Sequence, residues 1–279
     1  MQQTRAASGN YALAPERADL KQAEGTVKMK KLLAAAIALP AVVAFMSPAA
    51  AQETDSPSAI TLSGSAAVTS QYRFRGISLS DEDVAVQAGL TAAHQSGFYI
   101  GTWGSNLAGF GTFGGSNVEL DVYGGYKTDL GAAALDVGLL WYLYPGTDNT
   151  DFAEVYASIT GALGPATVKL GAAYAPEQDA AILTGTDNIY VYTDASVGVP
   201  NSPLTLKAHL GYSDGGQGNG LSPTGNYIDW LVGADVVYKN LTLGVAYVDT
   251  DIGRASAAAA AFDRGIADAA VVVTLGATF

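Results

Sequence analysis

Charged side chains recur at alternate positions along much of this sequence, a spacing that places them on one face of a β-strand. Seven carboxylates, five basic groups and one histidine share this parity. Such a face could form ion pairs or line a passage that attracts ions. The side chains that we predict to line the interior of a pore are Arg73, Arg75, Glu119, Asp121, Lys127, Asp136, Glu154, Lys169, Asp194, Lys207, His209, Asp229 and Asp235.

Arg73 and Arg75 are the two basic residues of this set that come first in the chain. Two inward-pointing guanidinium groups could coordinate anions at a constriction. A buried arginine more often pairs with a carboxylate, so we expect salt bridges to Glu119, Asp121 or loop carboxylates.

Catalytic chemistry has little support in the sequence. The chain contains two histidines, His94 and His209, and no cysteine or G-x-S-x-G nucleophile motif. Asp229 and Asp235 would lie about 20 Å apart on one strand, too far for paired acid–base catalysis. No nucleotide motif is present. We therefore predict no catalytic residue, no cofactor and no bound metal, and we interpret the acidic run Asp81–Asp83 as solvated loop charge rather than a calcium site.

The elements that must position the charged face are β-strands, because hydrophobic residues from Ile60 onward recur with a period of two. Val118, Leu120 and Val122 alternate with Glu119 and Asp121, for example. The same alternation runs through residues 135–144, 189–197 and 228–236.

Tight turns and long polar loops alternate between the predicted strands. The turns centre on Gly97, Gly131, Gly164, Asn201 and Asn240, which lie 33 to 39 residues apart, and each interval holds two strands and one long loop. This rhythm predicts an all-β fold, an antiparallel up-and-down β-barrel of about 12 strands with both ends on one side. Its first strand (about 60–74) would pair with its last.

A transmembrane barrel and a soluble β-sandwich or lipocalin-like barrel both produce alternation. Carboxylates and lysines in the middle of the strands favour the transmembrane barrel, because the interior of a small soluble barrel is apolar. Aromatic residues near the predicted strand ends would form the interfacial girdles of such a barrel. They are Tyr72, Phe74, Tyr126, Trp141, Tyr174, Tyr212 and Tyr238.

The N-terminal region has the pattern of a signal peptide, predicted over residues 29–51. Lys28, Lys30 and Lys31 precede an apolar run that is followed by Ala49–Ala51, a small-residue cleavage site. Residues 1–28 would be an upstream extension with Met29 as the true start, and 52–279 would form the barrel. Removing residues 1–51 leaves 8 basic and 23 acidic residues, a formal net charge of −15 that disfavours nucleic acid as a partner.

The C-terminal residues have one apolar face that ends in an aromatic side chain. Val273, Leu275 and Phe279 share that face. This pattern resembles the terminal signal by which outer-membrane barrels are recognised by the insertion machinery. An edge strand this apolar would promote aggregation unless it paired with the first strand.

Several segments resemble the TorF family of porins, a proteobacterial group first described as a conserved hypothetical family. They occur in order at hairpin spacing, with the sharpest motifs in the first half: YRFRGIS (72–78), SGFYIGTWGSN (96–106), ELDVYGGYK (119–127), LLWYLYPG (139–146) and EVYASI (154–159). The resemblance implies a pore in the outer membrane and supplies no substrate. The alanine-rich segment 255–262 matches none of these motifs.

These patterns together predict a porin-like channel in the cell outer membrane for passive diffusion of small polar or ionic solutes. Acidic loops would give it a mild cation preference. Outer-membrane lipid, lipopolysaccharide and the insertion machinery are the expected partners, and a homo-oligomer is compatible with the sequence. The alternatives are an outer-membrane enzyme of the lipase or protease type and a non-conducting structural or receptor barrel.

Overall fold

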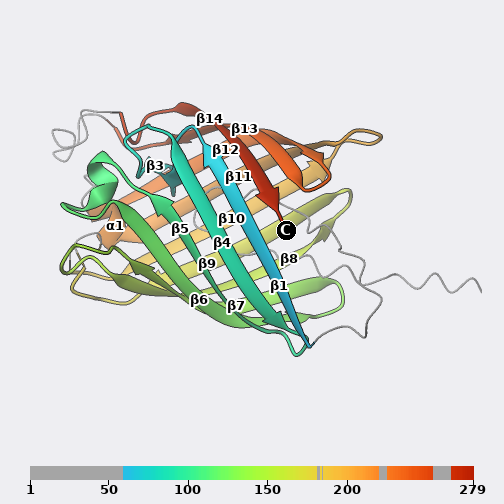
Figure 1. The fold of residues 1–279 in the computed structure, drawn as a ribbon, viewed down its shortest axis with the longest axis horizontal. Helices are drawn as coiled ribbons and strands as arrows, with labels where there is room; N and C mark the ends of the chain where they lie inside the picture. Colours follow the sequence, from blue (N-terminus) through green and yellow to red (C-terminus); the bar gives the residue numbers. More distant parts are fainter. Residues whose placement is uncertain (1–58, 181–182, 184, 220–224, 254–264) are drawn as a thin grey trace, which may run out of the picture. The chain divides into compact units, whose positions relative to one another are not determined.

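The computed structural model describes residues 59–180, 183, 185–219, 225–253 and 265–279. Twelve antiparallel strands form a closed barrel in the order β1-β14-β13-β12-β11-β10-β9-β8-β7-β6-β5-β4 (Figure 1). The fold class and the strand number predicted from the alternation are therefore confirmed. The strands are β1 (Ile60–Thr69), β4 (Ala85–His94), β5 (Phe98–Asn106), β6 (Val118–Asp129), β7 (Ala133–Leu143), β8 (Phe152–Leu163), β9 (Ala166–Ala175), β10 (Asn188–Gly198), β11 (Leu204–Gly215), β12 (Asn226–Tyr238), β13 (Leu241–Thr250) and β14 (Ala270–Thr278).

The outward face of the barrel consists mainly of large aliphatic side chains. Leu139, Val191 and Leu275 are 49%, 41% and 55% exposed. Polar residues of the same strands are buried on the other face, as alternation along a strand requires. The barrel is thus apolar outside and polar inside. In the described part of the chain, no helix is long and apolar enough to cross a membrane.

The two ends of the barrel differ in the length of their connections. One end, which we call the short-turn end, carries the connections β4–β5, β6–β7, β8–β9, β10–β11 and β12–β13. Gly97, at the first of these turns, has φ = +103°, a conformation that favours glycine. The opposite end, which we call the long-loop end, carries the 3-10 helix η1 (Gly109–Thr112) and the short helix α1 (Gly216–Asn219). The predicted alternation of turns and loops is confirmed.

The barrel closes between β1 and β14, where Ser65 pairs with Thr278 and Thr69 with Thr274. Beyond this register, the Gly64 N–H donates to the Phe279 carbonyl at 2.7 Å, and the Phe279 N–H donates to the Gly64 carbonyl at 3.0 Å. The Phe279 ring lies over Gly64, so a side chain at position 64 would collide with it. The predicted pairing of the first and last strands is confirmed.

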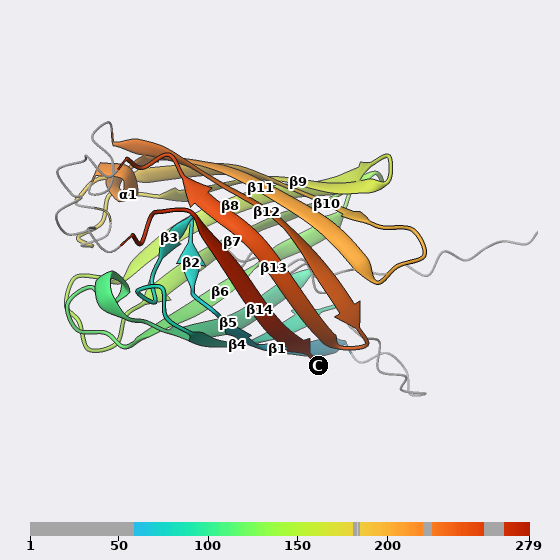
Figure 2. The same cartoon turned by 90° about the horizontal axis from the view of Figure 1, so that it is seen from above.

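The first strand is shorter than the sequence predicted. β1 ends at Thr69 instead of continuing to Phe74, and the chain then forms a separate two-stranded hairpin from β2 (Arg73–Phe74) and β3 (Ile77–Ser78). We call residues 71–80 the inner hairpin, because its side chains contact the inward faces of β6, β7, β8 and β10. Figure 2 shows β2 and β3 between the walls of the barrel.

The inner hairpin turns through Arg75 and Gly76, whose φ angles are +48° and +82°. Two consecutive residues with positive φ are typical of a type I′ turn, which suits a two-residue hairpin. Glycine is required at position 76 for a second reason. A Cβ there would overlap the Thr250 side chain and lie 2.9 Å from Asp229 Cβ. The tip of the hairpin therefore packs tightly against β12 and β13.

Candidate functional site: the polar interior of the barrel

Arg75, at the tip of the inner hairpin, is bound by side chains from several elements of the barrel interior. Its Nη2 donates to both carboxylate oxygens of Glu154 on β8, at 2.9 and 2.7 Å, and its Nη1 donates to Gln217 Oε1 of α1 at 2.6 Å. The guanidinium carbon lies 4.2 Å from the Tyr190 ring centroid and 4.8 Å from that of Phe74. Arg75 thus connects the hairpin tip to β8, β10 and α1.

The Arg75–Glu154 pair is almost completely shielded from water, with side chains 5% and 2% exposed. Burial by itself would lower the pKa of Arg75, but the adjacent Glu154 carboxylate outweighs burial and raises that pKa above its ordinary value. Arg75 therefore remains charged. The predicted salt bridge exists, but its predicted partner was wrong: the carboxylate comes from Glu154, not from Glu119, Asp121 or a loop.

Arg73 connects the base of the inner hairpin to the loop between β13 and β14. Its Nη1 donates to the carbonyls of Ile266 at 2.7 Å and Asp268 at 3.1 Å, and its Nε donates to Gln71 Oε1 at 2.6 Å. Its Nη2 lies 3.5 Å from Glu82, which matches the predicted loop carboxylate. Arg73 is 1% exposed, and its donors are largely saturated by the protein. Neither arginine is therefore arranged to coordinate a free anion.

His209 on β11 lies within a second polar cluster. Its Nδ1 is 2.6 Å from Asp194 Oδ1, and its Nε2 is 3.1 Å from Asp229 Oδ1. The Tyr190 hydroxyl is 2.9 Å from the same Nε2. Among the described residues, the groups that hydrogen-bond to His209 are two carboxylates and a phenol, and none is a serine or threonine hydroxyl.

Three further basic side chains face the interior nearer the short-turn end. Lys207 on β11 forms an ion pair with Asp235 at 2.7 Å. Lys169 on β9 lies 5.3 Å from the Tyr192 ring centroid and is paired in register with Asp194. Lys127 on β6 pairs in register with Asp136, which accepts a hydrogen bond from the Tyr99 hydroxyl. Opposite charges therefore alternate around this part of the wall.

Glu119 and Asp121 on β6, like Asp136 on β7, form no salt bridge among the described residues, whereas the other four inward carboxylates each do. The Tyr72 hydroxyl donates to Glu119 at 2.6 Å, whereas neither oxygen of Asp121 has a hydrogen-bond partner in the described structure. Both side chains are completely buried.

All thirteen residues predicted from parity have inward-directed side chains, although the arginines reach the interior from the inner hairpin and not from a barrel strand. The structure brings most of them into the clusters described above. Asp229 and Asp235 remain in different clusters, as their spacing predicted. Whether these residues line a conducting pore stays a prediction.

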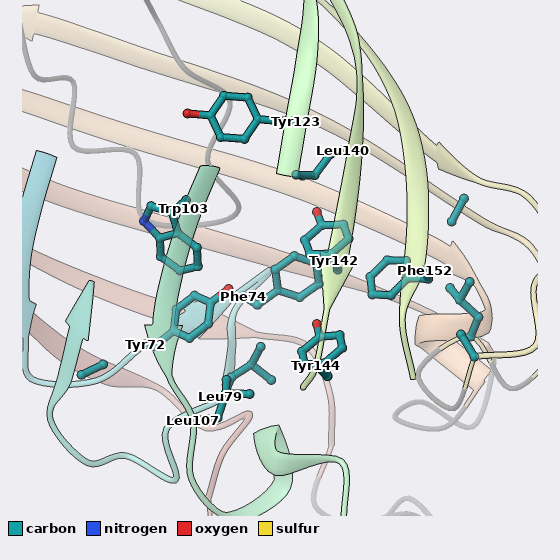
Figure 3. Close-up of a cluster of buried hydrophobic side chains, with 14 residues drawn as sticks. Tyr72, Phe74, Leu79, Trp103, Leu107, Tyr123, Leu140, Tyr142, Tyr144 and Phe152 are labelled. Carbon is teal, nitrogen blue, oxygen red and sulfur yellow. The ribbon is translucent and has the colours of Figure 1, made fainter. Parts of the chain in front are cut away.

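Aromatic residues form a large part of the interior that the sequence reasoning did not assign. Tyr72 and Phe74 were predicted to lie at the membrane interface, and this was wrong: they are 0% and 4% exposed and pack against Trp103 and Tyr142 (Figure 3). Strand parity could have identified Trp103 and Tyr123, which alternate with outward residues. It could not have identified Tyr72 or Gln217, because both lie outside the barrel strands.

No group of three or more histidine, aspartate or glutamate side chains in the described part of the chain has the arrangement of a metal site. Neither the acidic run Asp81–Asp83 nor the loop that carries Asp148 and Asp151 forms such a group. The alanine-rich segment 255–262 and the predicted signal peptide, residues 29–51, both lie outside the described residues.

Two solved structures of similar fold are porins. The first, described as "KdgM porin", is 10% identical with a TM-score of 0.51, and the match covers 78% of this chain and 98% of that chain. The second, a NanC porin, is 11% identical with a TM-score of 0.51, and the match covers 78% of this chain and 99% of that chain. At this identity the likeness establishes the barrel fold alone.

A comparison with curated proteins found no match. One family, described as "Bacterial protein of unknown function (Gcw_chp)", matches residues 51–279, which is most of the sequence and the whole of the barrel. The chain therefore belongs to the Gcw_chp family.

Proposed function

We propose that this protein is an outer-membrane channel for passive diffusion of small polar or ionic solutes, with a mild preference for cations. The observation that carries the proposal is the reversal of polarity across a closed sheet. Large aliphatic side chains cover the outside, whereas thirteen charged or titratable side chains face the inside. A bilayer solvates the first surface, and water or ion pairs are needed for the second.

An outer-membrane location is supported by the outward face. Exposed Leu, Val and Ile side chains continue around all twelve strands, an apolar area far larger than soluble monomers tolerate. The porin folds and the resemblance of the sequence to the TorF family agree with this location. So does the family match, which begins at residue 51, beside the predicted signal-peptide cleavage site. N-terminal sequencing of the mature protein would test export, with Gln52 as the expected first residue.

The inner hairpin favours small solutes over large ones. Barrels of about eight strands are filled by side chains, and those of 16 or more enclose an open channel. A twelve-stranded barrel lies between these cases, and here part of its interior is occupied by residues 71–80. Small solutes would therefore pass along the part of the polar inner wall that the hairpin does not cover.

The preference for cations follows from the charges. Inward carboxylates outnumber inward lysines and arginines by seven to five. The long-loop end adds exposed acidic residues, including Glu177 and Asp179. Acidic groups around an entrance raise the local cation concentration, an effect that salt screens over about 10 Å at 0.1 M.

Planar-bilayer recordings would test this proposal. Under a KCl gradient, we expect a conducting protein whose reversal potential indicates greater permeability to K⁺ than to Cl⁻. The double variant E177Q/D179N should reduce this preference at low salt and have little effect at high salt. D129N, a neutralisation at the short-turn end, serves as the matched control. Anion preference would contradict the selectivity, and absence of conductance would favour a structural or receptor barrel.

We also propose that Val273, Leu275 and Phe279 form the signal that directs barrel assembly. Val273 and Leu275 point outward on β14, and Phe279 is 72% exposed, so all three are accessible to an assembly factor before closure. Deleting Phe279 should reduce the folded protein recovered from outer membranes, because the ring over Gly64 and two backbone hydrogen bonds are lost. Heat-modifiability on gels measures this yield. Phe98→Ala, an exposed aromatic at the short-turn end, is the control, and equal yields from both variants would contradict the assignment.

A further inference from the structure

The carboxylate of Asp121 is buried without a partner. The side chain is 0% exposed, and neither carboxylate oxygen has a hydrogen-bond partner among the described residues. Glu154, which is equally buried, accepts hydrogen bonds from Arg75 and Tyr142. A buried carboxylate without hydrogen bonds or a counter-charge is very unfavourable in a protein interior. Among the described residues, no side chain therefore neutralises Asp121.

A second negative charge lies beside Asp121. Glu119 is two residues away on the same face of β6, at a separation of about 7 Å along the strand. The Tyr72 hydroxyl of the inner hairpin binds Glu119 at 2.6 Å, but a phenol contributes no positive charge. The guanidinium of Arg75, at the tip of the inner hairpin, is engaged by Glu154 and Gln217. Two carboxylates therefore lie close together, and no described residue forms a salt bridge with either of them.

Aromatic rings border the same region. In the register of the barrel, Trp103 on β5 and Tyr142 on β7 are the residues directly opposite Asp121. Both are buried, at 5% and 1% exposure, and Tyr72 packs edge-on against Trp103. Figure 3 shows these rings, together with Tyr144, on the inside of the barrel wall. The faces of aromatic rings attract cations electrostatically, although the rings carry no net charge.

We propose that Asp121, assisted by Glu119, binds a small monovalent metal cation, Na⁺ or K⁺, at the long-loop end of the barrel interior. A divalent ion is disfavoured, because the described residues hold no group of three or more acidic or histidine ligands around it. Complete burial disfavours a large organic cation. The inference deepens the proposed function by naming a cation and its site.

Unfolding in detergent micelles tests the site without requiring conductance. N-methylglucamine chloride is replaced stepwise by NaCl or KCl at constant ionic strength, and the unfolding midpoint is measured. For the native sequence, we expect the midpoint to rise and saturate with one of the two ions, as linkage requires for a ligand that binds only the folded state. In D121N, the apparent affinity for that ion should fall roughly tenfold or more, because a charged ligand is lost.

D136N is the matched control, because Asp136 is also a buried inward carboxylate, but it accepts a hydrogen bond from Tyr99. It should retain the native response to Na⁺ or K⁺. D121E, which keeps the charge, provides a second test if D121N does not fold, and it should retain a saturable response. The proposal is overturned if the native protein shows no saturable response, which would indicate a proton on Asp121, or if D121N responds as the native protein does. If the barrel bound the ion but did not conduct, the proposed channel function would be refuted and the cation site would stand.

Discussion

Replacing Arg75 with methionine is expected to lower the free energy of unfolding by about 3–5 kcal/mol, the usual cost of removing one partner from a buried ion pair. Methionine keeps much of the apolar stem but leaves Glu154, which is 2% exposed, without its counter-charge. It also removes the hydrogen bond to Gln217 and the stacking on Tyr190. Urea unfolding in detergent micelles, followed by tryptophan fluorescence, measures the change. Trp103 should report it, because its ring centroid is 5.4 Å from that of Tyr72 on the inner hairpin.

The double variant R75M/E154Q separates lost charge pairing from lost packing. Neutralising Glu154 removes the uncompensated charge, so the double variant should regain a large part of the stability lost in R75M. Gln217→Ala, which removes one neutral acceptor of Arg75, should cost much less than R75M. If R75M destabilised the protein by less than about 1 kcal/mol, as exposed ion pairs do, Arg75 would not hold the inner hairpin in place.

A charge on the outward face should be costly in proportion to its depth in the bilayer. Leu139 lies near the middle of β7 and Leu241 begins β13 beside a tight turn, yet their side chains are almost equally exposed, at 49% and 46%. In a membrane barrel, L139R should destabilise by about 2–4 kcal/mol and L241R by about 0–1 kcal/mol. The comparison is made by denaturant titration of protein folded into lipid vesicles.

The pair also distinguishes a membrane barrel from a soluble one, because both leucines have the same accessibility and differ only in position along the barrel. In water, two exposed leucines could be replaced by arginine at similar, small cost. Equal effects of L139R and L241R in vesicles would therefore contradict a bilayer around the outward face. L139Q, which is polar but uncharged, should fall between the native protein and L139R.

The sequence by itself determined the barrel. Alternation such as that around Val118–Val122 depends only on the local geometry of a strand. It therefore identifies a strand without knowledge of the neighbouring strands. The glycine and asparagine turns set the strand number, and the apolar face of residues 271–279 indicated that β14 pairs with β1. Local parity likewise assigned the inward side of Glu119, Asp121 and Glu154, because each occupies a regular strand.

Only the tertiary structure decided what those inward residues contact. Arg75 and Glu154 are 79 positions apart, and Arg73 and Ile266 are 193 apart, so their pairing depends on barrel closure and on how loops fold inside it. The segment 71–80 has a strand-like composition, and the sequence predicted a first strand that continued into it, to about residue 74. In the structure the chain leaves the wall after Thr69 and turns inward at Arg75 and Gly76. Its arginines, Tyr72 and Phe74 find partners inside the barrel, whereas Asp121 has no hydrogen-bond partner among the described residues.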